Sequence, residues 1–66
     1  MNRRELRAEI ARVGITNRCL ARELGVSEQA LYHKLGGRTE FKESEIKKII
    51  ALLDLSPRRV NEIFLT

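Results

Sequence analysis

The stretch from Asn17 to Leu35, NRCLARELGVSEQALYHKL, carries the pattern that decides the fold of this chain. Two helix-forming runs flank Gly25, a residue type that adopts the left-handed backbone conformation of a sharp turn at no steric cost. Ala21 precedes this glycine by one helical turn and is small enough to let two helices cross closely. Leucines recur on both sides of the turn at the spacing of buried helix faces. The stretch therefore predicts a helix-turn-helix over residues 17–35.

Capping residues and glycines divide the whole chain into five expected helices, and no segment has the alternating pattern of a β-strand. The expected N-caps are residues whose side-chain oxygens can accept hydrogen bonds from free amides of a first turn, namely Asn2, Thr16, Ser27 and Ser56. The expected helices cover residues 3–13, 17–24, about 28–35, 43–53 and a last segment that opens with Pro57. We expect an all-α fold with a single domain over residues 1–66.

The cap position before the fourth expected helix holds Lys42, and this residue departs from the pattern. A lysine cannot accept a hydrogen bond from the free amides of the helix start. One interpretation is that Lys42 and these amides suit a phosphate oxygen, because anions favour helix N-termini. The alternative is a solvated lysine, with water satisfying the amides.

Composition excludes several classes of function. Cys19 and His33 are the only cysteine and histidine, so neither a disulfide nor a Cys/His zinc site can form. No nucleophile has a base at a signature spacing, so we expect a non-enzyme without metal, cofactor or small-molecule substrate. The longest apolar run, residues 49–53, is far shorter than the ~20 residues of a membrane span, and the charged start lacks a secretory signal, which predicts a cytoplasmic protein.

A net charge of +4 and a pI near 9.8 favour a polyanionic partner. The combined pattern LARELGVS, LY and LGGR within residues 20–38 then resembles the Cro/CI-type helix-turn-helix family of phage and bacterial repressors. The resemblance covers essentially all 66 residues, and FKESEIKKII and VNEIFL are similar to small prophage-type regulators. It implies a compact lambda-repressor-like domain and double-stranded DNA as the partner. It also implies a recognition helix, here about residues 28–35, in the major groove.

Helix geometry gives an independent check on the face that would meet DNA. At ~100° per residue, Leu31 and Leu35 point to the core, so Gln29 and His33 share the opposite face. The candidate base-reading residues are Glu28, Gln29, Ala30, Tyr32 and His33. Gln29 can pair with adenine and Glu28 can accept from cytosine, although Glu28 can instead favour the helix dipole without contacting DNA. Ala30 can meet a thymine methyl group, and Tyr32 or His33 can reach either a base or a phosphate.

The resemblance further implies contacts to backbone phosphates around the recognition helix. The residues expected to make them are Asn17, Arg18, Ser27, Lys34, Arg38, Thr39 and Lys42. Asn17 stands where the family usually has the longer glutamine, and Lys34 stands where an apolar residue is often found. Arg3, Arg4 and Arg7 could extend the basic surface, but they are interleaved with glutamates, and a solvated face is the favoured expectation.

Proteins of this class usually bind as dimers to two half-sites, so we expect a weak homodimer, at least on DNA. The expected interface residues are Ile63 and Leu65, whereas Val60 and Phe64 are expected in the core. The expected function is a repressor that occupies a roughly palindromic operator at the nucleoid of a bacterial or phage-infected cell. The alternatives are a DNA-binding antitoxin or recruiter module of a larger complex, and a helix-turn-helix domain repurposed for protein–protein interaction.

Overall fold

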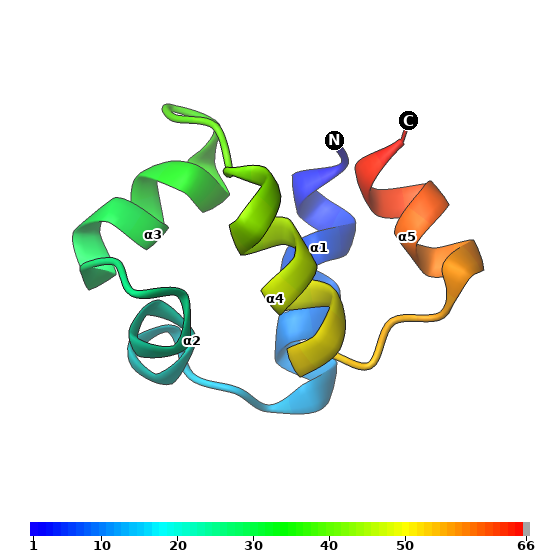
Figure 1. Cartoon of the computed structure of the whole chain (residues 1–66), viewed down its shortest axis with the longest axis horizontal. Helices are drawn as coiled ribbons and strands as arrows, with labels where there is room; N and C mark the ends of the chain where they lie inside the picture. Colours follow the sequence, from blue (N-terminus) through cyan, green and yellow to red (C-terminus); the bar gives the residue numbers. More distant parts are fainter. Residues whose placement is uncertain (66) are drawn as a thin grey trace.

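The computed structural model describes residues 1–65, and Thr66, the last residue of the expected domain, lies outside the described part. Within it the chain forms α-helices and no strand, which confirms the predicted all-α class (Figure 1). The helices are α1 (Arg3–Val13), α2 (Asn17–Leu24), α3 (Glu28–Gly36), α4 (Glu43–Leu52) and α5 (Pro57–Phe64). Their bounds agree with the sequence prediction to within a residue at almost every end.

Local hydrogen bonds explain where the helices begin. The Asn2 side chain accepts from the N–H of Glu5 at 3.1 Å. The helices that follow Thr16, Ser27 and Ser56 begin in the same way: the amide three residues later donates a hydrogen bond to the side-chain oxygen of the cap residue. Lys42 provides no such cap at α4. Instead the Glu45 carboxylate accepts from the Lys42 backbone N–H at 2.8 Å, which ties the first turn of α4 from the other side.

Three helices end in a glycine with a left-handed backbone, at Gly14, Gly25 and Gly37, with φ of 85°, 73° and 87°. The end of α4 uses a different residue. Asp54, just past Leu53, has φ 50° and is the one non-glycine residue within residues 1–65 with a positive φ. The Leu55 N–H then bonds to the Ile50 carbonyl at 3.1 Å, as in a Schellman-type ending.

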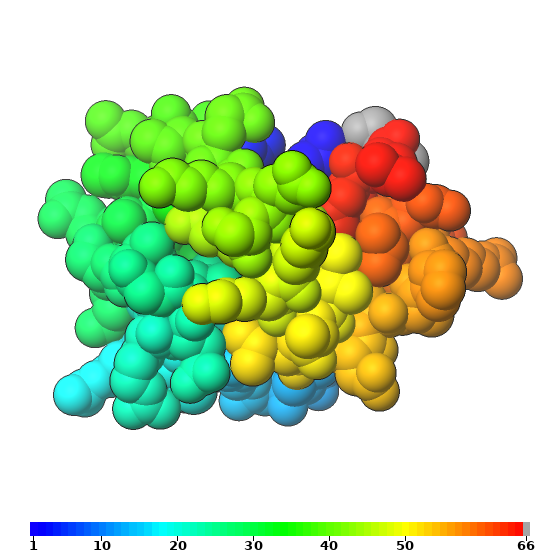
Figure 2. Space-filling view, viewed as in Figure 1, coloured from blue at the N-terminus to red at the C-terminus, as the bar shows by residue number. Residues whose placement is uncertain are grey.

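The core is built from one or two large aliphatic residues of each helix. The fully buried ones are Leu6, Leu20, Leu31, Ile49, Leu53 and Ile63. α2 packs on α3 and α4, and α1 contacts both α3 and α5. Figure 1 shows α2 and α3 at one end of the long axis and α5 at the other, with α1 and α4 between them. In the space-filling view, the surface of α4 separates these two ends (Figure 2).

Ion pairs fasten α5 to α1. The Arg59 guanidinium contacts the carboxylates of Glu5, Glu9 and Glu62, each at 3.0 Å. Glu9 is largely buried, and hydrogen bonds from Arg12 and from Arg59 hold the pKa of its carboxyl below the ordinary value, although burial opposes them. The same three carboxylates raise the pKa of Arg59, so its guanidinium stays charged.

Burial corrects one prediction about self-association. Ile63, expected in a dimer interface, is fully buried in the core, and its backbone carbonyl accepts from the Asn2 N–H at 2.6 Å. An apolar side chain without exposed surface cannot contribute to an interface between two folded copies. Leu65, its expected partner there, is 73% exposed.

Candidate nucleic-acid interface

The turn between α2 and α3 has the close approach expected of a helix-turn-helix. The Val26 N–H bonds to the carbonyl of Ala21 at 3.0 Å, and the Gly25 N–H to that of Arg22 at 3.1 Å. Ala21 is only 2% exposed, because the start of α3 packs against it. A larger side chain at this position would push the two helices apart. The small residue and the turn glycine thus fix how α3 is presented.

One face of α3 points to solvent, and its residues differ in part from those predicted. Gln29 is exposed as expected, but His33, expected on the same face, is partly buried. Glu28, Gln29 and Tyr32 are exposed, whereas Ala30 and His33 are partly buried. Tyr32 is the most notable of these, because 72% of its surface is accessible although the chain has only three aromatic residues for its core. Its ring lies 6.4 Å from the His33 ring, centroid to centroid, so the two side chains form one polar and aromatic surface.

The residues expected to contact phosphates flank this face. Asn17 and Arg18 lie exposed in the first turn of α2, and Arg38, Thr39 and Lys42 lie exposed in or at the end of the loop that joins α3 to α4. Ser27 is also exposed, but its hydroxyl oxygen already accepts from the Ala30 N–H as the cap of α3. Of these residues, Asn17 and Arg38 lie in the lining of one hollow together with Tyr32 of α3.

Lys34 is the exception, and the structure argues against its expected phosphate contact. It is 91% buried, and its ammonium lies 3.1 Å from the Glu45 carboxylate. The ammonium also donates to the Glu40 carbonyl at 3.0 Å and lies 5.9 Å from the centre of the Phe41 ring. The physical reason is that this position of α3 faces α4. The aliphatic part of the lysine side chain fills the place of an apolar residue, and its ammonium pairs with a carboxylate inside the domain.

Glu45 is ionised in this pair. Burial raises the pKa of its carboxyl, but the hydrogen bond from the Lys42 backbone and the contacts with the Lys34 ammonium together hold the pKa below the ordinary value. The side chains of Lys34 and Glu45 are only 11% and 7% exposed. A charged pair therefore joins the end of α3 to the start of α4.

Two arginines of α1 reach the carboxyl end of α3, which sequence reasoning missed. Arg3 Nε donates to the carbonyl of Lys34 at 2.9 Å, and Arg7 Nη1 to that of Leu35 at 2.8 Å. These carbonyls belong to the last turn of the helix, where cations offset the negative end of the helix dipole. The expectation of a purely solvated arginine face is thus corrected for Arg3 and Arg7. No local signal could have shown these bonds, because they join residues 31 and 28 positions apart.

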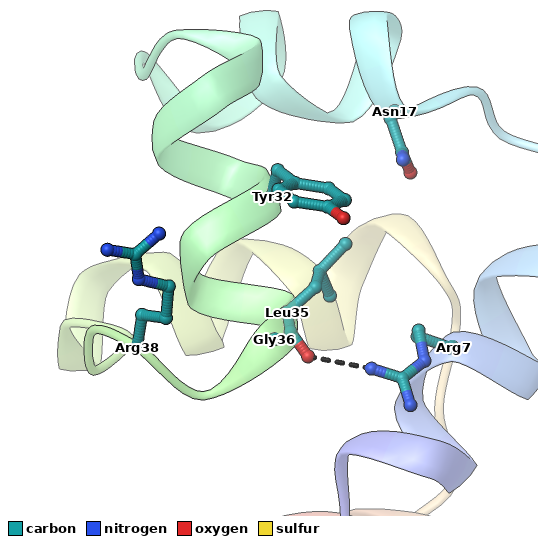
Figure 3. A pocket seen from close by; sticks show the side chains of 6 residues that line it. All are labelled: Arg7, Asn17, Tyr32, Leu35, Gly36 and Arg38. Carbon is teal, nitrogen blue, oxygen red and sulfur yellow. Dashed lines mark hydrogen bonds between the residues drawn. The ribbon is translucent and has the colours of Figure 1, made fainter.

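A hollow lies beside these contacts, between α1, the start of α2 and the last turns of α3 (Figure 3). We call it the α1–α3 hollow; its lining residues are Arg7, Asn17, Tyr32, Leu35, Gly36 and Arg38. In Figure 3 the Asn17 amide and the Tyr32 hydroxyl point toward the space that the Arg7 guanidinium faces from α1. No carboxylate lines it.

The ion pairs lie mostly away from this region. Arginines and lysines that bond a carboxylate at the surface lie on α1, α4 and α5, and they are Arg12, Lys47, Arg58 and Arg59. Arg7 and Arg38, which line the α1–α3 hollow, and the exposed Arg18 and Lys42 contact no carboxylate within residues 1–65. The positive charge beside α3 is therefore not neutralised inside the domain, and it is available to an external anion.

The remaining geometry adds no second kind of site. In the described part of the chain, no three His, Cys, Asp or Glu side chains gather closely enough to hold a metal ion. None of its helices is long and apolar enough to cross a bilayer.

Comparison with known proteins gives one match. Neither the curated proteins nor the solved structures contained a significant match to this chain. One protein-family profile matches residues 3–66, nearly the entire sequence, and its description is "Protein of unknown function (DUF739)". On this near-complete match, the chain belongs to the family DUF739.

Proposed function

We propose that this protein binds double-stranded DNA with sequence preference and acts as a transcriptional repressor of the Cro/CI type. The observation that carries the proposal is the exposed face of α3, which follows a helix-turn-helix turn and lies beside Arg7 and Arg38, two cations that contact no carboxylate within residues 1–65. A tyrosine left 72% exposed in so small a domain supports a surface used for contact rather than for folding. α3 is proposed to lie in the major groove.

The proposed base contacts follow from side-chain chemistry. Gln29 can form a bidentate pair with adenine, and Glu28 can accept from the amino group of cytosine. The methyl group of Ala30 suits thymine, and His33 has ring nitrogens that can reach a base edge or a phosphate. All four lie on or beside the exposed face of α3.

The proposed phosphate contacts come from residues that flank α3. Asn17, Arg18, Arg38, Thr39 and Lys42 are all exposed. Such contacts supply affinity and orientation and do not distinguish sequences. Because they release counterions from the DNA, binding should weaken as the salt concentration rises.

Repression by this mechanism would place the protein in the cytoplasm, at the nucleoid. We further propose that two copies bind the two halves of a roughly palindromic operator, about one helical turn apart. Leu65, 73% exposed after the end of α5, is the candidate residue for contact between the copies. Sedimentation of the protein with operator DNA tests this arrangement, and one copy on each full operator would contradict it.

The proposed function is tested by selecting bound sequences from random duplex DNA at ~150 mM salt, where non-specific phosphate binding is weakened. The proteins compared are wild type, the double variant Gln29→Ala with His33→Ala, and the control Asn61→Ala, which alters an exposed amide on α5. We expect wild type and the control to enrich one inverted repeat. The double variant should lose the preference and keep weak, salt-sensitive binding. If wild type enriches no sequence, the proposal is wrong and a protein partner for α3 is favoured.

A further inference from the structure

We propose that the α1–α3 hollow holds one phosphodiester group of the DNA backbone, with Arg7 and Tyr32 as its principal ligands. This inference rests on the proposed function, and it changes two assignments. Arg7, for which the sequence favoured a solvated face, becomes a specific DNA contact, and Tyr32, which the sequence grouped with the base-reading residues while leaving a phosphate contact open, becomes a backbone ligand. The argument has four steps, taken from the lining of the hollow.

The first step concerns how Arg7 is held. Its Nη1 donates to the Leu35 carbonyl at 2.8 Å, which fixes the guanidinium at the rim of the hollow. Its other N–H groups have no carboxylate partner within residues 1–65. A guanidinium that is already oriented loses less side-chain entropy when it binds, and its planar fork of donors matches two phosphate oxygens.

The second step concerns the neutral donors. Asn17 and Tyr32 are exposed, and neither side chain has a hydrogen-bond partner in the described structure. The two side chains come from different helices, yet Figure 3 shows the amide and the hydroxyl directed toward the same space. Unpaired donors that converge beside a fixed cation suit an anion with several acceptor oxygens.

The third step concerns charge. A helix carboxyl end repels anions, and the last turn of α3 forms part of the lining. Arg3 and Arg7 offset this repulsion, because they bond to the carbonyls of Lys34 and Leu35. With Arg38 as a further cation and no carboxylate in the lining, the hollow as a whole favours negative charge.

The fourth step concerns space and position. Gly36 lies in the lining, and no atom lies within 4 Å of the place where its Cβ would be, so the end of α3 leaves room for a ligand. The hollow borders the exposed face of α3 at its carboxyl end, whereas base edges are met by the amino end of a recognition helix. The DNA group that would occupy the hollow therefore belongs to the sugar-phosphate backbone that borders the major groove, and its anionic part is a phosphate.

The test pairs protein variants with modified DNA. Neutral methylphosphonate linkages replace single phosphates along the operator that wild type selects, and the binding constant is measured for wild type, Arg7→Met, Tyr32→Phe and the control Arg4→Met. Arg4 is exposed on α1 and lies outside the hollow. Tyr32→Phe removes only a hydroxyl from an exposed ring, so it cannot fail through misfolding.

Wild type should lose about tenfold in affinity when one particular phosphate is neutralised, as expected for a charge-assisted contact. Arg7→Met should lose about tenfold on unmodified DNA, reduce the slope of log K against log salt by about 1, and show no further loss at that phosphate. Tyr32→Phe should bind about threefold more weakly, with an unchanged base preference and a smaller loss at the same phosphate. Arg4→Met should behave like wild type.

Two results would overturn the inference while the proposed function stands. In the first, wild type binds DNA, but each methylphosphonate substitution lowers the affinity of wild type, Arg7→Met and Tyr32→Phe by the same factor. In the second, Tyr32→Phe has a changed base preference, which would show that Tyr32 contacts a base and not the backbone. If wild type binds no duplex DNA at all, both the proposed function and this inference fail.

Discussion

Lys34 shows how one side chain can serve the packing of α3 while keeping its charge. The family resemblance placed this lysine among the phosphate contacts, although an apolar residue is often found at its position. Its position on α3 faces α4 instead, and Glu45 from the first turn of α4 meets its ammonium. A buried charge is tolerated only when it is paired and hydrogen-bonded, and the Glu40 carbonyl completes that requirement.

Breaking this pair on one side should be costly. Lys34→Met keeps the stem but leaves the Glu45 carboxylate buried without its ammonium, so we expect a loss of about 2–3 kcal/mol in the free energy of unfolding. Adding Glu45→Gln removes the unpaired charge while the amide oxygen can still accept from the Lys42 N–H, which should recover part of the loss. Urea unfolding followed by circular dichroism measures both values. A double variant less stable than Lys34→Met would contradict this account.

The limits of sequence reasoning at this scale follow from distance along the chain. Exposure of Gln29 could be predicted, because the period of a helix and the positions of its leucines decide which side faces out. The same periodicity placed His33 on that face, but His33 is partly buried. The bonds from Arg3 and Arg7 to α3 could not be predicted, since they depend on how α1 docks in three dimensions. The partner of Lys34 was missed for the same reason.

At the scale of the element, the ends of the helices differ in how well their residues suit the backbone. Gly14, Gly25 and Gly37 occupy left-handed positions that glycine adopts without strain. At the end of α4 the left-handed position is occupied by Asp54, with φ 50°. The sequence did not mark this turn because no glycine stands there, and the helix end was placed one residue late.

Asp54→Gly should therefore stabilise the domain. Removing the Cβ from a left-handed position relieves strain worth about 0.5–1 kcal/mol, partly offset by the greater entropy of glycine in the unfolded chain. Thermal unfolding of wild type and Asp54→Gly compares the two proteins. An unchanged or lower midpoint would show that the aspartate makes a compensating contribution.

The paired glycines at the end of α3 should respond in opposite directions to the same substitution. Gly37→Ala places a Cβ at φ 87°, so we expect it to destabilise by about 1 kcal/mol. Gly36→Ala lies within the helix, where a Cβ meets no atom within 4 Å, and it should stabilise by up to about 1 kcal/mol. Equal effects in chemical unfolding would argue against the helix end described here.

At the scale of the whole molecule, two groups of ion pairs hold the helices together. Arg59 joins α5 to α1 through Glu9, and Lys34 joins α3 to α4 through Glu45. Both glutamates have pKa values below the ordinary 4.5 in the folded protein. A lowered carboxyl pKa contributes stability that is present above the unfolded value and is lost as the pH falls through the folded value.

The domain should accordingly keep a constant melting temperature from neutral pH to about 5 and lose at least about 5 °C on further acidification. Glu9→Gln and Glu45→Gln should melt lower at neutral pH and lose less on acidification, because each lacks one of the groups that must be protonated. Glu43→Gln, which alters an 86% exposed side chain, serves as the control and should follow wild type. Parallel profiles for all four proteins would rule out this role for the two glutamates.

The sequence predicted the number and bounds of the helices because caps, glycines and helical periodicity act within a few residues. Asn2, Thr16 and Ser27 each cap a helix as expected. It did not predict that α1 lies between α3 and α5, which depends on contacts among all five helices. For the same reason Ile63 was expected at a surface, although it completes the core from α5.

The outward residues of α3 have a practical consequence for protein engineering. Glu28, Gln29 and Tyr32 contribute almost nothing to the core, whereas Leu31 and the tethers at the carboxyl end hold the helix in place. A combinatorial library that varies these three positions should therefore yield mostly folded members. The domain is a scaffold whose exposed α3 surface can be changed while its architecture is retained.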